Sequence, residues 1–130
     1  MKVIYIKTEY DKKHNYRFKT NIKMTQIVDT LDTYYSLLEC TSIDIIVRTI
    51  ANKKVAIIVD GERHLKRENK DKFPIAICTN ANEQLFGNII IAGIDTTEDL
   101  SDVPITIQDI SMDLYSIDKF KGIPLYEYQI

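Results

Sequence analysis

The sequence predicts an α+β domain in which an antiparallel sheet, built from hairpins, carries two amphipathic helices packed on one face. Three observations support this. Short runs rich in Ile, Val and Tyr alternate with turn residues, which is typical of hairpins. Two segments, near residues 25–39 and 107–117, instead repeat apolar residues every three or four positions, which is typical of helices with one buried face. The length of 130 residues fits a single domain, 1–130.

The N-terminal part is expected to form a hairpin followed by a helix. Residues 2–7 (KVIYIK) and 16–20 (YRFKT) have the β-branched and aromatic composition of strands, and the polar DKKHN between them favours a turn. Thr25 is expected to cap the helix near 25–39, because a threonine hydroxyl accepts hydrogen bonds from backbone N–H groups of the first turn. The apolar face of this helix comprises Ile27, Val28, Leu31, Tyr34, Tyr35 and Leu38.

A second hairpin is predicted from two runs rich in Ile and Val, at residues 43–50 and 55–59. The polar link Ala51-Asn52-Lys53-Lys54 joins them. Asp60-Gly61 is a turn signal that ends the second run. The highly charged residues 62–72 are expected to form a solvated loop or a short helix.

The C-terminal part is expected to contain the most apolar strand and the second helix. Residues 73–78 indicate a short buried segment, and 88–94 within GNIIIAGI indicate a buried strand. Thr106 and Asp109 have the spacing of a capping box, so the helix near 107–117 should begin there. The closing KGIPLYEYQI is expected to lie extended against the body of the domain.

The residue types argue against an enzyme and against a bound cofactor. The histidines, His14 and His64, lie in charged segments that favour solvated imidazoles, so no nucleophile–base pair stands out. A phosphate-binding loop needs closely spaced glycines, because only glycine lets the backbone approach phosphate. No such spacing occurs among the four glycines, which are Gly61, Gly87, Gly93 and Gly122.

Cys40 and Cys78 are predicted to be buried, reduced thiols without a metal. They are isolated from each other in the sequence, whereas zinc sites pair their ligands at short spacing. Cys40 ends the first predicted helix, and Cys78 lies in the apolar PIAICT. The sequence shows no disulfide framework, no signal peptide and no run of roughly 20 apolar residues. These features favour a cytoplasmic protein without a membrane segment.

Charge is unevenly distributed along the chain. Residues 1–72 carry fifteen Lys or Arg and ten Asp or Glu, whereas residues 73–118 carry eight acids and no Lys or Arg that could neutralise them locally. The basic residues of 63–72 are interleaved with acids, so direct nucleic-acid binding is not predicted. An acidic stretch can steer a basic partner, although acids also cap helices and solubilise surfaces. The predicted partner-binding face consists of Asp95, Glu98, Asp99, Asp102, Asp109 and Asp113.

From Leu31 to Asp113 the chain resembles a family of small phage, plasmid and transposon proteins of unknown function. Three segments carry the resemblance in their order and spacing: VAIIVDGERHLK, LFGNIIIAGID with Gly-Asn before an apolar strand, and ITIQDISMDL before an acidic helix. The family's loop after the hairpin, with Pro and Asn, is replaced here by the charged RENKDKFP. The resemblance implies a phage or mobile-element context, in which small acidic proteins inhibit host defence nucleases.

Two functions of different classes follow from these observations. The first is a non-enzymatic protein-binding module of a phage or mobile element, acting in the host cytoplasm as an anti-CRISPR-like inhibitor of a defence nuclease. Its acidic face would bind a basic host protein or nucleoprotein complex. The alternative is a small-ligand binding protein, for instance for a nucleotide signal. A contiguous exposed carboxylate face would favour the inhibitor, and a pocket lined by Tyr and backbone amides would favour the ligand binder.

Overall fold

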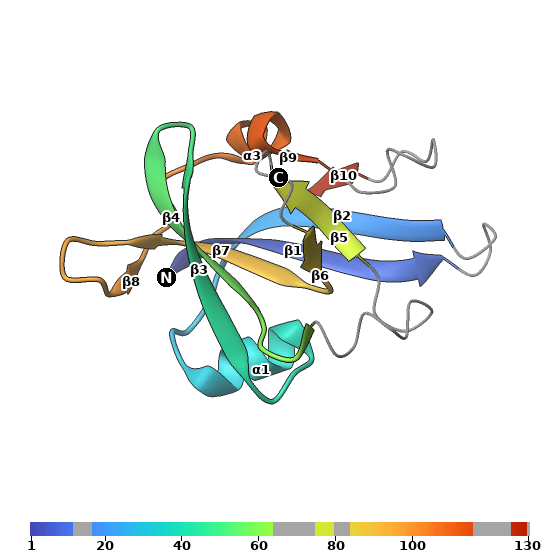
Figure 1. Ribbon diagram of the computed structural model, residues 1–130, viewed down its shortest axis with the longest axis horizontal. Coiled ribbons are helices and arrows are strands. Elements are labelled where there is room, and N and C mark those ends of the chain that lie inside the picture. The colour runs from blue at the N-terminus through green and yellow to red at the C-terminus, as the bar shows by residue number, and fades with distance from the viewer. Residues whose placement is uncertain (12–16, 64–74, 80–83, 116–125, 130) are drawn as a thin grey trace.

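A mainly antiparallel sheet with the strand order β10-β2-β1-β7-β4-β3 forms the centre of the computed structural model (Figure 1). The structure describes residues 1–11, 17–63, 75–79, 84–115 and 126–129. Within these, the strands of the main sheet are β1 (Lys2–Asp11), β2 (Arg17–Gln26), β3 (Ile43–Ile50), β4 (Lys53–Asp60), β7 (Ile89–Ile94), β8 (Leu100–Ser101) and β10 (Tyr126–Gln129). A smaller sheet has the order β6-β5-β9, with β5 (Ile75–Thr79), β6 (Gln84–Phe86) and β9 (Leu114–Tyr115).

The first predicted hairpin is confirmed, but both of its strands are longer than expected. Asp11 of the predicted turn belongs to β1, and the rest of that turn lies outside the described residues. β2 pairs antiparallel with β1 along its whole length, and Thr25 lies opposite Val3 in this ladder. Thr25 is therefore a strand residue and not the helix cap. Helix α1 (Leu31–Leu38) begins after Thr30, whose hydroxyl accepts a hydrogen bond from Thr33 N at 3.3 Å. Pairing with β1 outweighs the local capping signal, because the β1–β2 ladder satisfies the backbone N–H and C=O groups of many residues, whereas a cap satisfies only one or two N–H groups.

The second predicted hairpin is also confirmed, with a tighter turn. β3 and β4 pair antiparallel, and Lys53 lies opposite Ile50. Only Ala51 and Asn52 remain in the turn, with φ angles of 52° and 63°. Two successive left-handed residues match the right-handed twist of the flanking strands, which is why two-residue hairpin turns favour this geometry. The predicted four-residue link is therefore wrong by two residues, since Lys53 and Lys54 belong to the strand.

The two helices lie on opposite faces of the sheet, which corrects the prediction that they share one face. Ile57 and Ile58 are neighbours on β4, so their side chains point to opposite faces, and they belong to two separate buried clusters. Leu38 of α1 packs in the cluster of Ile58, whereas Ile110 of α3 (Ile107–Asp113) packs in that of Ile57. In Figure 1, α1 accordingly lies at the bottom and α3 at the top.

The central strands explain this arrangement. Residues 3–6, 55–59 and 89–92 are buried without interruption, so β1, β4 and β7 are apolar on both faces. A sheet that is apolar on both faces needs a cover on each. Each helix therefore shields one side.

The C-terminal elements agree in part with expectation. The apolar strand predicted at 88–94 is β7, and the segment predicted at 73–78 corresponds to β5. The tail was expected to lie extended, and residues 126–129 form β10, which adds a parallel strand beside β2. Helix α3 ends at Asp113, four residues before the expected end. Of the charged segment 62–72, residues 64–72 lie outside the described part. No helix among the described residues is long and apolar enough to cross a bilayer.

Candidate functional site

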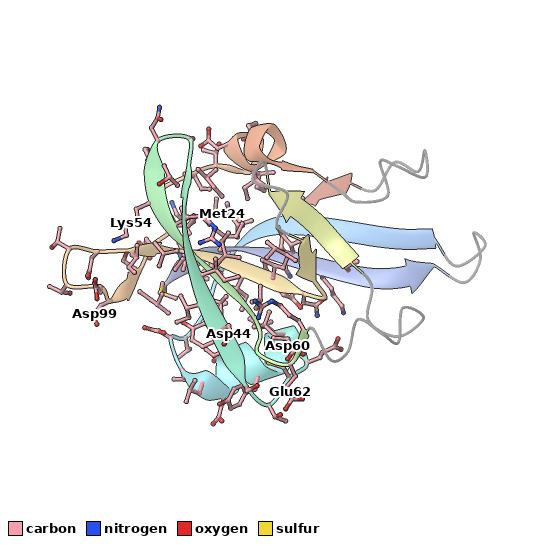
Figure 2. The ribbon with its side chains drawn as sticks, in the orientation of Figure 1. Met24, Asp44, Lys54, Asp60, Glu62 and Asp99 are labelled. Carbon is pink, nitrogen blue, oxygen red and sulfur yellow. The ribbon has the colours of Figure 1, made fainter. Side chains whose placement is uncertain are left out.

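Three of the six predicted acids lie in the turn between β7 and β8, residues 95–99, here called the acidic turn. Asp95, Glu98 and Asp99 are exposed there, and Asp99 is labelled at the left of Figure 2. Asp95 Oδ1 accepts hydrogen bonds from the backbone N of Thr97 at 2.9 Å and of Asp99 at 3.0 Å. The backbone closes the same loop, because Asp95 N donates to Asp99 O at 2.9 Å. Hydrogen bonds within the acidic turn therefore hold its backbone in one conformation.

The Thr97 hydroxyl joins two carboxylates of the acidic turn. Its oxygen lies 2.7 Å from Asp95 Oδ1 and 2.9 Å from Asp99 Oδ2, so the two carboxylates share the single hydroxyl proton as a hydrogen-bond donor. This hydrogen bond is the main cause that lowers the pKa of Asp95, and the backbone N–H of Asp99 adds to it. Asp95 is therefore ionised at neutral pH. Glu98 adopts a left-handed φ of 66°, which bends the loop at its tip.

Asp102 lies where the chain leaves the hairpin, and its carboxylate is used within the fold. Its Oδ1 accepts a hydrogen bond from Lys2 N at 2.8 Å, and Val103 N donates to Lys2 O at 2.8 Å. The segment crosses very close to β7, because a Cβ atom on Gly93 would lie 2.2 Å from the Asp102 carbonyl oxygen. Asp102 thus holds the end of the hairpin against β1.

The two remaining acids belong to α3. Asp109 completes the predicted capping box: its Oδ2 accepts from Thr106 N at 2.9 Å, while Asp109 N donates to the Thr106 hydroxyl at 3.4 Å. Asp113 is the last residue of α3, and its side chain lies outside the described part. The capping role explains Asp109 without any partner.

The fold therefore divides the six acids among three places: the acidic turn, the end of β8 and α3. It also brings a basic residue of another segment beside the acidic stretch. Lys53 of β4 donates from Nζ to Pro104 O at 3.1 Å, between β8 and α3. Strand pairing places β4 next to β7, so the fold brings the positive charge of Lys53 from a distant part of the sequence to this stretch. The acidic turn is the part of the predicted face that keeps several exposed carboxylates together.

Asn88 makes structural contacts that the local sequence does not indicate. It is buried at the start of β7, and its Oδ1 accepts a hydrogen bond from Thr8 N at 3.0 Å. Its Nδ2 donates to Leu37 O at 3.0 Å and lies 3.4 Å from Glu39 Oε2. Gly87 precedes it with a φ of 76°, a conformation that favours glycine. The Gly-Asn pair thus ties β1, β7 and the end of α1 together, and its role is structural.

The Asp60-Gly61 pair also has a structural explanation. Asp60 is buried, and its Oδ1 accepts a hydrogen bond from Glu62 N at 2.8 Å, which is the predicted turn. Arg63 donates from Nη1 to Asp44 Oδ2 at 2.6 Å and to Asp60 O at 3.3 Å. The turn after β4 is therefore joined to β3 by an ion pair.

One shallow depression bears on the alternative of a small-ligand site. It is lined by Tyr5, Lys7, Asn21 and Lys23 on β1 and β2, with a volume of about 60 Å³. The Lys23 ammonium lies 6.0 Å from the centre of the Tyr5 ring. Pockets for nucleotide-sized ligands measure roughly 300–1,000 Å³. This depression can hold a water molecule or a small ion, but it is too small for a nucleotide.

The residues considered for catalysis or metal binding are only partly described. Cys40 is buried in the same cluster as Leu38 of α1, as expected. Cys78 lies in β5, and its side chain is outside the described part. His14 and His64 are also outside it. Within the described ranges, no group of three or more His, Cys, Asp or Glu side chains is placed to hold a metal ion.

Comparisons with protein-family models, with curated proteins and with solved structures found no match for this chain. The resemblance to small phage, plasmid and transposon proteins remains a hypothesis based on its three motifs. Two of those motifs now have a structural role in this fold, namely the Gly-Asn pair before β7 and the capping box of α3.

Proposed function

We propose that this protein is a non-catalytic protein-binding module that binds a basic partner through the acidic turn, residues 95–99. One observation carries the proposal: Asp95 and Thr97 hold this exposed loop in order, so that Glu98 and Asp99 are presented in a fixed arrangement. A preorganised loop loses less conformational entropy on binding than a flexible loop does, and this smaller loss improves affinity. Exposed charges at such a site mainly raise the association rate and select partners of opposite sign.

The partner class proposed here is a nucleic-acid-binding protein of the host, with a defence nuclease as the leading candidate. The channel of such a protein is basic because it neutralises phosphates. Carboxylates on a narrow hairpin can occupy the positions of phosphates and block the channel. The β7–β8 hairpin has a suitable form, because it projects from the body of the domain (Figure 1). The motif resemblance adds the phage or mobile-element context and action in the host cytoplasm.

Salt dependence is a signature of this mode of binding. The Debye length is about 10 Å at 0.1 M salt and about 3 Å at 1 M, so attraction between exposed charges weakens steeply over that range. Binding through the acidic turn should therefore weaken as salt is added. Binding through an apolar surface would change little.

The test uses purified guide-loaded RNA-guided nucleases as probes, with binding measured by biolayer interferometry at 0.05 M and 0.3 M salt. The variant E98Q/D99N removes two exposed charges of the acidic turn and keeps Asp95, which orders it. The matched control, D32N/E62Q, removes two exposed acids from α1 and from the turn after β4. Loss of two such contacts at about 0.7 kcal/mol each corresponds to a tenfold weaker Kd.

The proposal expects at least one nuclease to bind the parent and the control alike, and to bind E98Q/D99N about tenfold more weakly at 0.05 M salt. The difference should shrink at 0.3 M. Equal binding of all three proteins would show that the acidic turn is not the binding surface. Absence of binding to every nuclease tested would exclude this partner class.

A further inference from the structure

Strand β3 forms an open edge of the main sheet. It stands at the end of the strand order, and within the described part of the chain it pairs with β4 alone. Figure 1 shows the β3–β4 hairpin running from its turn at the top to α1 at the bottom. Ile45 and Val47 on this strand are 47% and 38% exposed, although both are large apolar side chains. An edge strand with exposed apolar residues is a template for pairing with another strand.

The pairing with β4 determines which backbone groups of β3 face outward. Gly61 N donates to Ser42 O at 2.9 Å, so Ser42 and Gly61 form a hydrogen-bonded pair at one end of the ladder. Hydrogen-bonded and non-hydrogen-bonded pairs alternate along an antiparallel ladder. Even-numbered residues of β3 therefore bond to β4, and the N–H and C=O groups of Ile45 and Val47 point away from it. In agreement, Arg48 Nη1 reaches around the edge to Val47 O at 2.7 Å.

The side chains of β3 are self-complementary. We propose that β3 pairs antiparallel with β3 of a second copy of this chain, on a two-fold axis at Ile46. In this register Ile45 of each copy lies opposite Val47 of the other, and the outward N–H and C=O groups of these residues bond each other. Asp44 of each copy lies opposite Arg48 of the other, on the same face as Ile46. These charged residues form non-hydrogen-bonded pairs, in which opposing side chains are closest.

The charges select this register over its neighbours. A two-fold axis at Ile45 would place Asp44 opposite Ile46, and an axis at Val47 would place Arg48 opposite Ile46, so neither charge would meet its opposite. A two-fold axis at Asp44 would place Asp44 opposite Asp44 of the second copy, and an axis at Arg48 would place Arg48 opposite Arg48. Like charges directly opposite each other are destabilising. The axis at Ile46 joins both charges of each copy to an opposite charge. Register is therefore specified by two residues of an eight-residue strand.

The partners that Asp44 and Arg48 have within one chain are compatible with the dimer. Asp44 is 54% exposed and uses Oδ2 for Arg63, and it is labelled beside β3 in Figure 2. Arg48 is exposed, and its contact with the Val47 carbonyl covers an outward acceptor. On pairing, the guanidinium moves to Asp44 of the second copy and leaves that carbonyl to the Val47–Ile45 bond. The contact is isologous, so two copies close it and no fibre follows.

Sedimentation velocity of the intact chain, over about 1–300 μM, tests the proposal together with two charge reversals. D44R places Arg opposite Arg48, and R48D places Asp opposite Asp44, so each variant repels itself. A mixture of the two variants restores opposite charges at every position of the proposed register. The parent is expected to dimerise with a Kd on the order of 10 μM, as for a small interface. Each variant alone should dimerise at least tenfold more weakly, and the equimolar mixture should recover the parent's dimer.

Hydrogen exchange of the unmodified chain supplies a test that needs no variant. The amides of Ile45 and Val47 should exchange about fivefold more slowly at 300 μM than at 5 μM, because a Kd on the order of 10 μM lowers the monomer fraction by that factor. The amides of Ile46 and Arg48, which bond to β4, should change far less. A monomer at 300 μM, or a dimer that forms equally well from D44R alone and from R48D alone, would overturn the proposal. Because β3 and the acidic turn are separate surfaces, E98Q/D99N should leave this dimer unchanged.

Discussion

Replacing Asn88 with alanine is expected to destabilise the protein by about 2–4 kcal/mol. The side chain of Asn88 is buried and bonds three parts of the chain: Thr8 on β1, Leu37 in α1 and, at longer range, Glu39 just after α1. The variant Asn88→Ala removes all of these bonds at once. The substitution therefore removes the contacts that join the start of β7 to β1 and to α1.

The magnitude follows from the groups left behind. The buried N–H of Thr8 loses its acceptor at 3.0 Å, and an unsatisfied buried donor costs about 1–3 kcal/mol. The carbonyl of Leu37 loses one donor but keeps the Tyr5 hydroxyl at 2.6 Å, so its share is only about 0.5–1 kcal/mol. The vacated volume adds a small cavity term. Together these give a fall in Tm of roughly 10 °C for a chain of this size.

Urea unfolding, followed by circular dichroism on the parent and on Asn88→Ala, measures this loss. Asn88→Asp is a second variant that keeps an acceptor for Thr8 N but cannot donate to Leu37 O, and it adds a negative charge near Glu39. Asn88→Asp should therefore be destabilised at pH 7 and recover part of the loss near pH 4, where the carboxyl can be protonated. A change below about 0.5 kcal/mol in Asn88→Ala would mean that these hydrogen bonds do not stabilise the fold, because surface substitutions have effects of that size.

Three further variants test the local geometry. Gly93→Ala should destabilise by about 1–3 kcal/mol in the same urea assay, because the new methyl group meets the Asp102 carbonyl at 2.2 Å; an unchanged midpoint would contradict this close crossing. Asp95→Asn should lose stability relative to the parent at pH 7. Because hydrogen bonds from Thr97 lower the pKa of Asp95 in the folded state, its contribution is present above its unfolded pKa of about 3.9, and is lost as the pH falls through the lower folded value. The difference should therefore shrink towards pH 3, and a pH-independent difference would argue against this role. Ala51→Gly should stabilise by about 0.5–1 kcal/mol, because Ala51 has a left-handed φ of 52°; a loss in melting temperature would contradict the turn.

Much of the strand framework could be predicted, because the local signals agree with the tertiary structure. Both hairpins and the capping box of Thr106 and Asp109 are examples. The prediction failed where a distant partner decided the outcome. Thr25 carries a helix-capping signal, but pairing with Val3 makes it a strand residue. The prediction that both helices lie on one face is wrong, because periodicity shows that a helix has an apolar side and does not show which side of the sheet that helix covers.

The site could be predicted only in part, for the same reason. Composition identified the acidic residues, but their use within the fold depends on segments far away in sequence. Asp102 accepts a hydrogen bond from Lys2 N across a separation of a hundred residues. Lys53 reaches Pro104 from β4. Asn88 was recognised as part of a motif, although nothing in the local sequence indicates that Thr8 and Leu37 converge on it.

If the acidic turn occupies a basic nucleic-acid channel of a partner protein, this protein and a nucleic acid must compete for that channel. A nuclease that binds the parent is loaded with a fluorescently labelled target oligonucleotide, and the anisotropy is followed at 0.05 M salt as the protein is added. We expect the parent and D32N/E62Q to displace the oligonucleotide with equal midpoints, and E98Q/D99N to require about tenfold more protein. Retention of the oligonucleotide at saturating parent protein, or identical midpoints for all three, would contradict this expectation.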